Sequence, residues 1–196
     1  MELRTFATVI VAVPALFLAG CGSVPLVRTS PEMSWVHQHG AAIPGADQRR
    51  AQRLCDNLCS GFSACELNVV ILESSSLGGW SWPDGHIYLT SALVHVADDA
   101  ELSAAIAHEM GHLVNNHKVH PPQALARGEE HLGIETAADV TGCRILASHG
   151  IAPVSMIDLL EMVRAKSSRA ALRRALSQRI SYLDHKIGSS PDKIRK

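Results

Sequence analysis

The feature that most constrains this chain is the pentapeptide His108-Glu109-Met110-Gly111-His112, which lies within a segment of helical periodicity. Apolar residues recur every three or four positions from Leu102 to Val114, and Asp98 followed by Glu101 is the capping-box pattern that begins a helix. On a helix, residues four apart project only about 40° from each other, so the two imidazoles share one side, away from the apolar stripe. The pattern predicts a helix that forms one wall of a metal site.

A catalytic zinc site needs three protein ligands and one open position, so two histidines leave it incomplete. A third histidine in the pattern HExxHxxGxxH is excluded, because Asn115 and Lys118 stand where its glycine and histidine are required. A second expected helix carries the run ETAAD, which begins at Glu135, 23 residues after the second histidine, and ends at Asp139. Alone, such an acidic pair is also typical of a solvated face. Here we expect Glu135 to be the third ligand and Asp139 to orient a ligating histidine by a hydrogen bond.

Three segments carry a family resemblance. Residues 78–88 read GGWSWPDGHIY, residues 99–109 read DAELSAAIAHE, and residues 135–139 form an ExxxD motif. In this order they resemble the gluzincin metalloendopeptidases of the HtpX-like and CAAX-prenyl-protease-like family, which includes small periplasmic lipoproteins. The resemblance implies that His108, His112 and Glu135 bind one Zn²⁺ per chain and that Glu109 is the catalytic acid and base.

The chain departs from that family at three places. Gly78 stands where the family usually has Asn, and the interval from His112 to Glu135 is short, which implies a trimmed loop over the cleft. Residues 177–183, SQRISYL, resemble the family's terminal stretch "THP..ERI..L" but lack its His-Pro. None of these departures removes an expected metal ligand.

Substrate-binding residues are less constrained. As part of a sheet edge, Gly79, Trp80 and Ser81 are candidates for pairing with an extended polypeptide, although burial of the aromatic residues in the core fits the pattern equally well. Three side chains are candidates for stabilising the oxyanion, and the sequence does not choose among them: His131, Tyr182 and His185. The other histidines considered are expected at the surface or in hydrogen bonds: His86, His95, His117, His120 and His149.

The N-terminus predicts export. Residues 1–20 read as a signal peptide, because residues 6–19 are uncharged and too few to span a membrane as a permanent anchor. The following LAGC run resembles a bacterial lipobox, which makes Cys21 the expected lipidation site, with an ordinary cleaved signal as the alternative. Residues 21–44 are then a spacer from the lipid, and Gly22 favours the periplasmic face of the outer membrane.

Four cysteines remain in a chain expected in an oxidising compartment: Cys55, Cys59, Cys65 and Cys143. Three pairings are possible if both bridges form. Because Cys55 and Cys59 are four apart on an expected helix, the favoured scheme joins one of them to Cys65 and the other to Cys143. Buried free thiols are the alternative.

Residues 45–190 are expected to form one α+β domain, followed by a basic tail at 191–196. A small, mostly antiparallel sheet is expected from a strand at 67–72 and a hairpin at 80–90 that turns at Asp84-Gly85. It would pack against the active-site helix and further helices over 46–60, 130–149, 154–166 and 169–187. A hydrophobic content of 46% is enough for a sizeable core, and a net charge of −1 argues against a nucleic-acid partner.

The resemblance implies a zinc-dependent endopeptidase that hydrolyses misfolded or misassembled cell-envelope proteins. Polypeptides would be its substrates, and the lipid at Cys21 would hold it to the membrane. A non-catalytic, zinc-containing envelope lipoprotein with a binding or chaperone-like role is the alternative. An amidohydrolase of cell-wall peptides is a third hypothesis, since it would share the metal chemistry.

Overall fold

The computed structural model describes residues 35–36, 38–61, 65–117 and 128–188. The signal peptide, Cys21, most of the spacer, His120 and the basic tail lie outside the described residues. The helices are α2 (Ala46–Cys59), α3 (Ser91–Val96), α4 (Asp99–Val114), α5 (Gly128–Ser148), α6 (Val154–Lys166) and α7 (Ala170–Gly188). The strands are β1 (Asn68–Leu72), β2 (Gly79–Ser81) and β3 (His86–Thr90). This arrangement confirms the expected α+β class.

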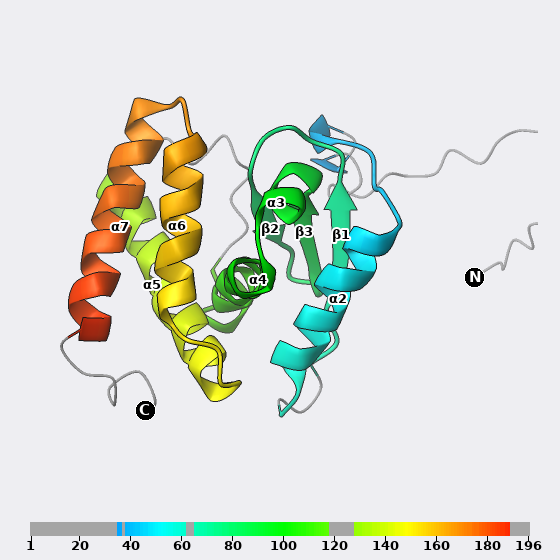
Figure 1. The fold of residues 1–196 in the computed structure, drawn as a ribbon, viewed down its shortest axis with the longest axis horizontal. Helices are drawn as coiled ribbons and strands as arrows, with labels where there is room; N and C mark the ends of the chain where they lie inside the picture. The colour runs from blue at the N-terminus through cyan, green and yellow to red at the C-terminus, as the bar shows by residue number, and fades with distance from the viewer. Residues whose placement is uncertain (1–34, 37, 62–64, 118–127, 189–196) are drawn as a thin grey trace, which may run out of the picture.

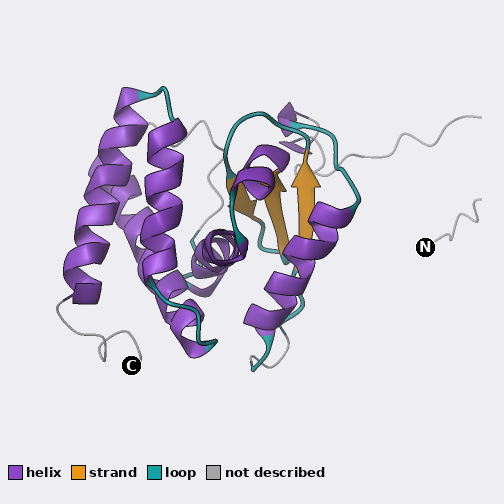
Figure 2. Ribbon diagram, viewed as in Figure 1, coloured by secondary structure: helices purple, strands orange, loops and turns teal. Residues whose placement is uncertain are grey.

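Helix α4 lies at the centre of the molecule. In Figure 1 it is seen end-on, with the sheet and α2 on one side and helices α5, α6 and α7 on the other. Figure 2 shows the same division, with all three strands gathered in one half. Most of α4 is buried, including Leu102, Ile106 and Met110 of the expected stripe. Helix α4 therefore packs between the sheet layer and the helical layer.

The sheet has the order β1-β3-β2. Strand β2 runs antiparallel to β3, but β1 runs parallel to β3, with Asn68 opposite His86 and Leu72 opposite Thr90. The sheet is therefore mixed, and the expectation of a mostly antiparallel sheet is wrong in this respect. Strand β3, in which every residue after His86 is buried, takes the central position between β1 and the short β2.

The predicted hairpin is confirmed. Gly85 has a φ of +95°, and its amide donates to the carbonyl of Trp82. A Cβ at Gly85 would lie 2.9 Å from the carbonyl oxygen of Glu66, so this turn excludes a side chain for two reasons. The turn sets the register that places Ser81 opposite Ile87.

Side-chain caps fix the starts of α4 and of the short helix α3 that precedes it. The side chain of Asp98 accepts from the amides of Ala100 and Glu101, and Glu101 accepts from the amide of Asp98, so the predicted capping box is confirmed. The short helix α3 was not expected, because six residues are too few to show a periodicity. Thr90 begins it by accepting from the amide of Leu93.

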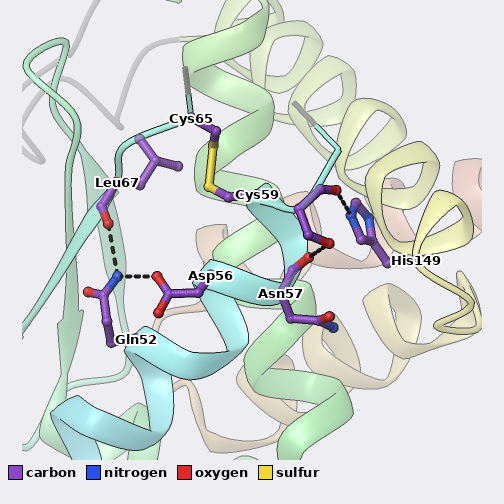
Figure 3. The surroundings of a disulfide bond; sticks show 8 residues. Gln52, Asp56, Asn57, Cys59, Cys65, Leu67 and His149 are labelled. Carbon is purple, nitrogen blue, oxygen red and sulfur yellow. Dashed lines mark hydrogen bonds between the residues drawn. A yellow bond between two sulfur atoms is a disulfide. The ribbon is translucent and has the colours of Figure 1, made fainter. Parts of the chain in front are cut away.

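One disulfide lies among the described cysteines and joins Cys59 to Cys65 beyond the end of α2 (Figure 3). Cys55 and Cys143 are buried free thiols, so the expected second bridge is wrong. The reason is that Cys55 faces the core from the middle of α2, whereas Cys59 lies at the end, where the chain turns back. Burial, helped by Asp56, raises the pKa of Cys55 to about 12, and burial raises that of Cys143 to about 12.

The helical layer follows the expected bounds closely. Helix α6 covers the predicted residues 154–166, and α5 and α7 differ from the predicted ranges by one or two residues at each end. The C-terminal end of α5 also touches the end of α2, where His149 Nε2 lies 2.8 Å from the carbonyl oxygen of Ser60 (Figure 3). None of the described helices combines the length and apolar character that a bilayer crossing requires.

Candidate metal centre

Three side chains from two helices converge on one point. His108 and His112 project from α4 and Glu135 from α5, and their ligand atoms all lie within 4.8 Å of one another. The two Nε2 atoms are 3.1 Å apart. Glu135 Oε2 lies 3.4 Å from His108 Nε2, and its Oε1 lies 3.6 Å from His112 Nε2. The three residues that the sequence singled out are thus brought together.

Two glycines let these helices approach closely. A Cβ at Gly111 would lie 2.4 Å from the carbonyl oxygen of Ala138, and a Cβ at Gly142 would lie 3.0 Å from that of Ala107. Each helix therefore presents bare backbone to the other at the level of the site. This contact brings the Glu135 carboxylate within reach of imidazoles that lie 23 or more residues earlier in the chain.

The spacing of the donors suits a tetrahedral ion. Ligands about 2.0–2.1 Å from a zinc ion lie roughly 3.3 Å from one another at the corners of a tetrahedron. The two Nε2 atoms are 3.1 Å apart, and each lies 3.4 or 3.6 Å from the nearer oxygen of Glu135, which is Oε2 for His108 and Oε1 for His112, so these separations are close to that value. Two imidazole nitrogens with one carboxylate are also a donor set that zinc uses in catalytic sites, with a fourth position open.

Behind the donors lies a buried ion pair. Asp139 is 0% exposed, and its Oδ1 lies 2.8 Å from His108 Nδ1. Arg179 of α7 donates to both oxygens of this carboxylate, at 2.7 Å from Nε and 2.6 Å from Nη2. Its Nη1 donates to Glu135 Oε2 at 3.1 Å. One guanidinium therefore holds both acidic side chains of the site.

Hydrogen bonds orient the two imidazoles. Because the Asp139 carboxylate only accepts, Nδ1 of His108 carries a hydrogen, which directs Nε2 toward the donor cluster. His112 Nδ1 lies 3.0 Å from Nδ1 of His117, so one of these two nitrogens donates to the other. When His112 is the donor, its Nε2 is free to bind a cation beside that of His108.

The pKa values show strong coupling among these groups. Burial alone would lower the pKa of His108, but the carboxylates of Asp139 and Glu135 outweigh it and raise the pKa to about 10. Burial and the charge of His108 lower the pKa of His112 to about 3. The neighbouring His108 and Arg179 hold the pKa of Glu135 well below its usual range despite burial. In the metal-free protein His108 is therefore the charged partner and His112 the neutral one, and a bound cation would require His108 to lose its extra proton.

Glu109 lies between the two histidines in sequence but faces the sheet. It is 6% exposed and hydrogen-bonds to Ser81 of β2, and burial raises its pKa to about 7. A Cβ at Gly79 would lie 3.1 Å from Glu109 Oε1 and 3.0 Å from a methyl group of Leu89. The carboxylate is therefore packed against the backbone of the edge strand, beside the donor cluster but outside it.

The three predicted substrate-binding residues of β2 divide into two groups. Gly79 and Ser81 lie next to Glu109, whereas the ring of Trp80 packs against Trp35, with centroids 5.1 Å apart. Trp80 thus belongs to an apolar cluster on the sheet that also contains Tyr88 and Trp82. The ring of Trp80 is half-buried in this cluster, whereas its backbone lies on β2 at an edge of the sheet.

The three oxyanion candidates also differ in position. Nε2 of His131 lies 3.6 Å from Glu135 Oε1, which places this residue at the rim of the cluster. Tyr182 is 47% exposed, and its hydroxyl lies 3.3 Å from Lys186 Nζ along α7. His185 is exposed on the same helix.

The sequence reasoning missed two residues of the site. Arg179 lies on the buried face of α7 between Leu176 and Leu183, at a position where the helical period leads one to expect an apolar residue. A charged side chain at such a position indicates a buried partner of opposite charge. His117 was expected at the surface or in a hydrogen bond, and it is half-buried with its Nδ1 3.0 Å from that of His112, a contact with a metal-ligand candidate that the sequence did not indicate. The φ of +52° at Asn116 turns the chain back to bring it there, and no periodicity reveals such a turn.

Comparison with known proteins agrees with this geometry. Residues 47–128 match the family model described as Peptidase family M48. No curated protein matches the chain. The matched segment contains His108, Glu109 and His112 but ends before Glu135 and Arg179. The match supports an M48 metallopeptidase family and a metalloprotease function, and the remaining donor set comes from the packing of α5 and α7 against α4.

Proposed function

We propose that this chain is a zinc-dependent endopeptidase, a small lipoprotein of the HtpX-like kind, in which His108, His112 and Glu135 hold one Zn²⁺. The observation that carries the proposal is the convergence of these donors, whose ligand atoms lie within 4.8 Å of one another, with Glu109 beside them at a strand edge. The match of residues 47–128 to Peptidase family M48 supports the same chemistry.

The ion would supply Lewis acidity, which polarises a scissile carbonyl and activates water near neutral pH. Glu109 accepts the proton of the attacking water on a carboxylate oxygen and passes it to the departing amide nitrogen. A carboxylate whose pKa lies near 7, as burial makes that of Glu109, is suited to both halves of this transfer. Asp139 and Arg179 keep the donors in place by holding His108 and Glu135.

Strand β2 gives the substrate a place to bind. It pairs with β3 along one side, and the described residues form no ladder on its other side. An extended polypeptide that adds to this edge would make main-chain hydrogen bonds next to Glu109. Recognition through the backbone favours unfolded segments over any one sequence, which supports misfolded or misassembled proteins as substrates.

The N-terminal sequence supports an envelope location. The lipobox-like LAGC run makes Cys21 the proposed attachment site for lipid, with the domain held at the periplasmic face of the outer membrane. Envelope proteins that fail to fold would then be the substrates within reach.

Metal content and cleavage of unfolded casein, measured together, test the proposal. Glu109→Gln should abolish cleavage while one zinc per chain is retained, because Glu109 moves a proton and does not bind the ion. Glu66→Gln, an exposed change in the loop before β1, is the matched control and should leave both quantities unchanged. Cleavage that survives Glu109→Gln would refute the proton-transfer role of Glu109, and a wild type that binds zinc but cleaves nothing would favour a non-catalytic zinc protein.

A further inference from the structure

The connection between α6 and α7 carries an unusual concentration of positive charge. Residues 162–178 contain five Lys or Arg and no Asp or Glu. Arg164 pairs with Glu161. The other four are exposed and define what we call the basic turn: Lys166, Arg169, Arg173 and Arg174.

The basic turn lacks compensating charge. No carboxylate among the described residues forms an ion pair with any of its four side chains, and the one contact recorded for a guanidinium is from Arg173 to the carbonyl of Ser167 at 3.0 Å. Arg173 and Arg174 also border an open depression of about 380 Å³, together with the polar Ser177 and Gln178. Uncompensated cations around a shallow polar hollow favour an anionic partner.

The shape and composition of this surface favour a membrane over a protein groove. The large apolar side chains that the structure exposes lie elsewhere: Ile43, Val96, Val114, Val154 and Tyr182. Contact at the basic turn is therefore electrostatic, without insertion into the hydrocarbon core. Each Lys or Arg near an anionic leaflet contributes about fivefold to the partition coefficient, so four exposed cations are enough for a reversible contact.

The start of the described chain lies toward the same edge of the molecule. In Figure 1, residues 35–36 (blue) and the α6–α7 connection (orange) both lie along the upper margin of the view. Cys21 precedes Trp35 by 14 residues, a tether that spans at most about 50 Å when extended. The inference rests on the lipid attachment at Cys21 proposed above: that attachment would limit how far the domain can lie from the membrane, and a second contact would select its orientation.

We propose that the basic turn docks on the anionic phospholipid headgroups of the membrane that holds the N-terminal segment. The contact gives the domain a preferred orientation, with the N-terminal end of α7 toward the lipid. Arg179 lies on the same helix, less than two turns beyond Arg174, so docking also sets the position of the metal centre relative to the membrane. The inference concerns a surface outside the proposed catalytic machinery and does not depend on zinc.

A pair of fluorescent probes at opposite ends of α6 tests this orientation. The full chain is reconstituted into vesicles, and a probe is attached to Ser168→Cys in the basic turn or to Ala152→Cys before α6, both exposed positions. The 13 residues of α6 separate them by about 20 Å. Cys55 and Cys143 are buried, Cys59 and Cys65 are joined in a disulfide, and in the lipidated protein the Cys21 thiol carries the lipid, so labelling is selective, and the protein without an added cysteine gives the background. Quenching by a headgroup spin-labelled lipid is then compared in neutral vesicles and in vesicles containing phosphatidylglycerol.

The Ser168 probe should be quenched several-fold more in anionic than in neutral vesicles, and high salt should remove the difference, whereas the Ala152 probe should not respond. The basic-turn variant is Lys166→Gln, Arg169→Gln and Arg174→Gln, and it should lose most of the effect, at about fivefold per cation. The matched control removes three exposed arginines elsewhere and should behave as the wild type: Arg49→Gln, Arg53→Gln and Arg144→Gln.

Three results would overturn the proposal. One is equal quenching of the Ser168 probe in neutral and anionic vesicles. Another is equal loss in the basic-turn variant and in the matched control, which would show an effect of net charge alone. The last is protection of the Ser168 probe by soluble polyglutamate with no dependence on anionic lipid, which would assign the surface to an acidic protein.

Discussion

Arg179 provides the most informative perturbation, because its guanidinium donates hydrogen bonds to the carboxylates of both Glu135 and Asp139. Arg179→Met removes the guanidinium at similar length and leaves Asp139, which is 0% exposed, with His108 as its remaining recorded partner. Three hydrogen bonds of 2.6, 2.7 and 3.1 Å are lost. Removing one member of a buried pair typically costs about 3–5 kcal/mol, and we expect the free energy of unfolding to fall by that amount.

The assay is urea unfolding of chelator-treated protein, so that metal binding does not contribute to the free energy. A double-mutant cycle with Asp139→Asn isolates the pair, and the double variant should be more stable than the sum of the single effects predicts by about 1–3 kcal/mol. Arg174→Met on the exposed side of the same helix is the control, expected to change stability by less than about 0.5 kcal/mol.

Zinc affinity is the second readout for the same variants. Because Arg179 holds the Glu135 carboxylate and, through Asp139, the ring of His108, its loss should weaken zinc binding by about 10–100-fold. The reasoning is refuted if Arg179→Met costs less than about 1 kcal/mol, combines additively with Asp139→Asn and leaves zinc affinity unchanged.

Other consequences follow from close contacts and from buried charge. Gly111→Val should separate α4 from α5 and lower the free energy of unfolding by about 3 kcal/mol or more in urea melts, because the first added carbon would lie 2.4 Å from the Ala138 carbonyl oxygen. Gly79→Val should abolish peptide cleavage while zinc content is retained, since the new side chain presses on Glu109 rather than on the ligands. Acid unfolding should reflect Asp139, whose pKa is held below its ordinary value of 3.8 by Arg179 and His108 against the effect of burial. The ionised Asp139 carboxylate contributes to the free energy of unfolding above pH 3.8, and this contribution is lost as the pH falls through the depressed pKa. In melts of metal-free protein, the free energy of unfolding of Arg179→Met should therefore fall less with acid than that of the wild type.

Much of the fold was predictable because it depends on local chemistry. The capping box at Asp98 and the recurrence of apolar residues every three or four positions located α4. Pro153 preceded the start of α6 as expected. The Asp84-Gly85 turn located the β2–β3 hairpin, because its geometry excludes a side chain. These signals act over a few residues, and such short-range constraints can be read from a single sequence.

Features that depend on long-range packing were not predictable in the same way. Periodicity reports neither strand order nor strand direction, so the parallel pairing of β1 with β3 was not predicted. The separation of Cys143 from the other cysteines reflects where α5 packs. Arg179 lies 44 residues beyond Glu135, so its partnership with that carboxylate and with Asp139 exists only once α7 has docked.

The proposed site itself lies between these extremes. The spacing of His108 and His112 on one helix predicted that they share a side, and the structure places their Nε2 atoms 3.1 Å apart. The approach of Glu135 depended on Gly111 and Gly142, which let two helix backbones meet. Nothing in the ETAAD run alone distinguishes this arrangement from a solvated acidic face.

X-ray absorption at the zinc edge of the metal-loaded protein, combined with metal analysis, tests the coordination most directly. We predict one zinc per chain with only nitrogen and oxygen ligands at about 2.0–2.1 Å and the outer-shell scattering of two imidazoles. Glu135→Gln should weaken the binding and change the spectrum. A sulfur ligand at about 2.3 Å, or a spectrum and affinity unaltered by Glu135→Gln, would contradict a centre built from His108, His112 and Glu135.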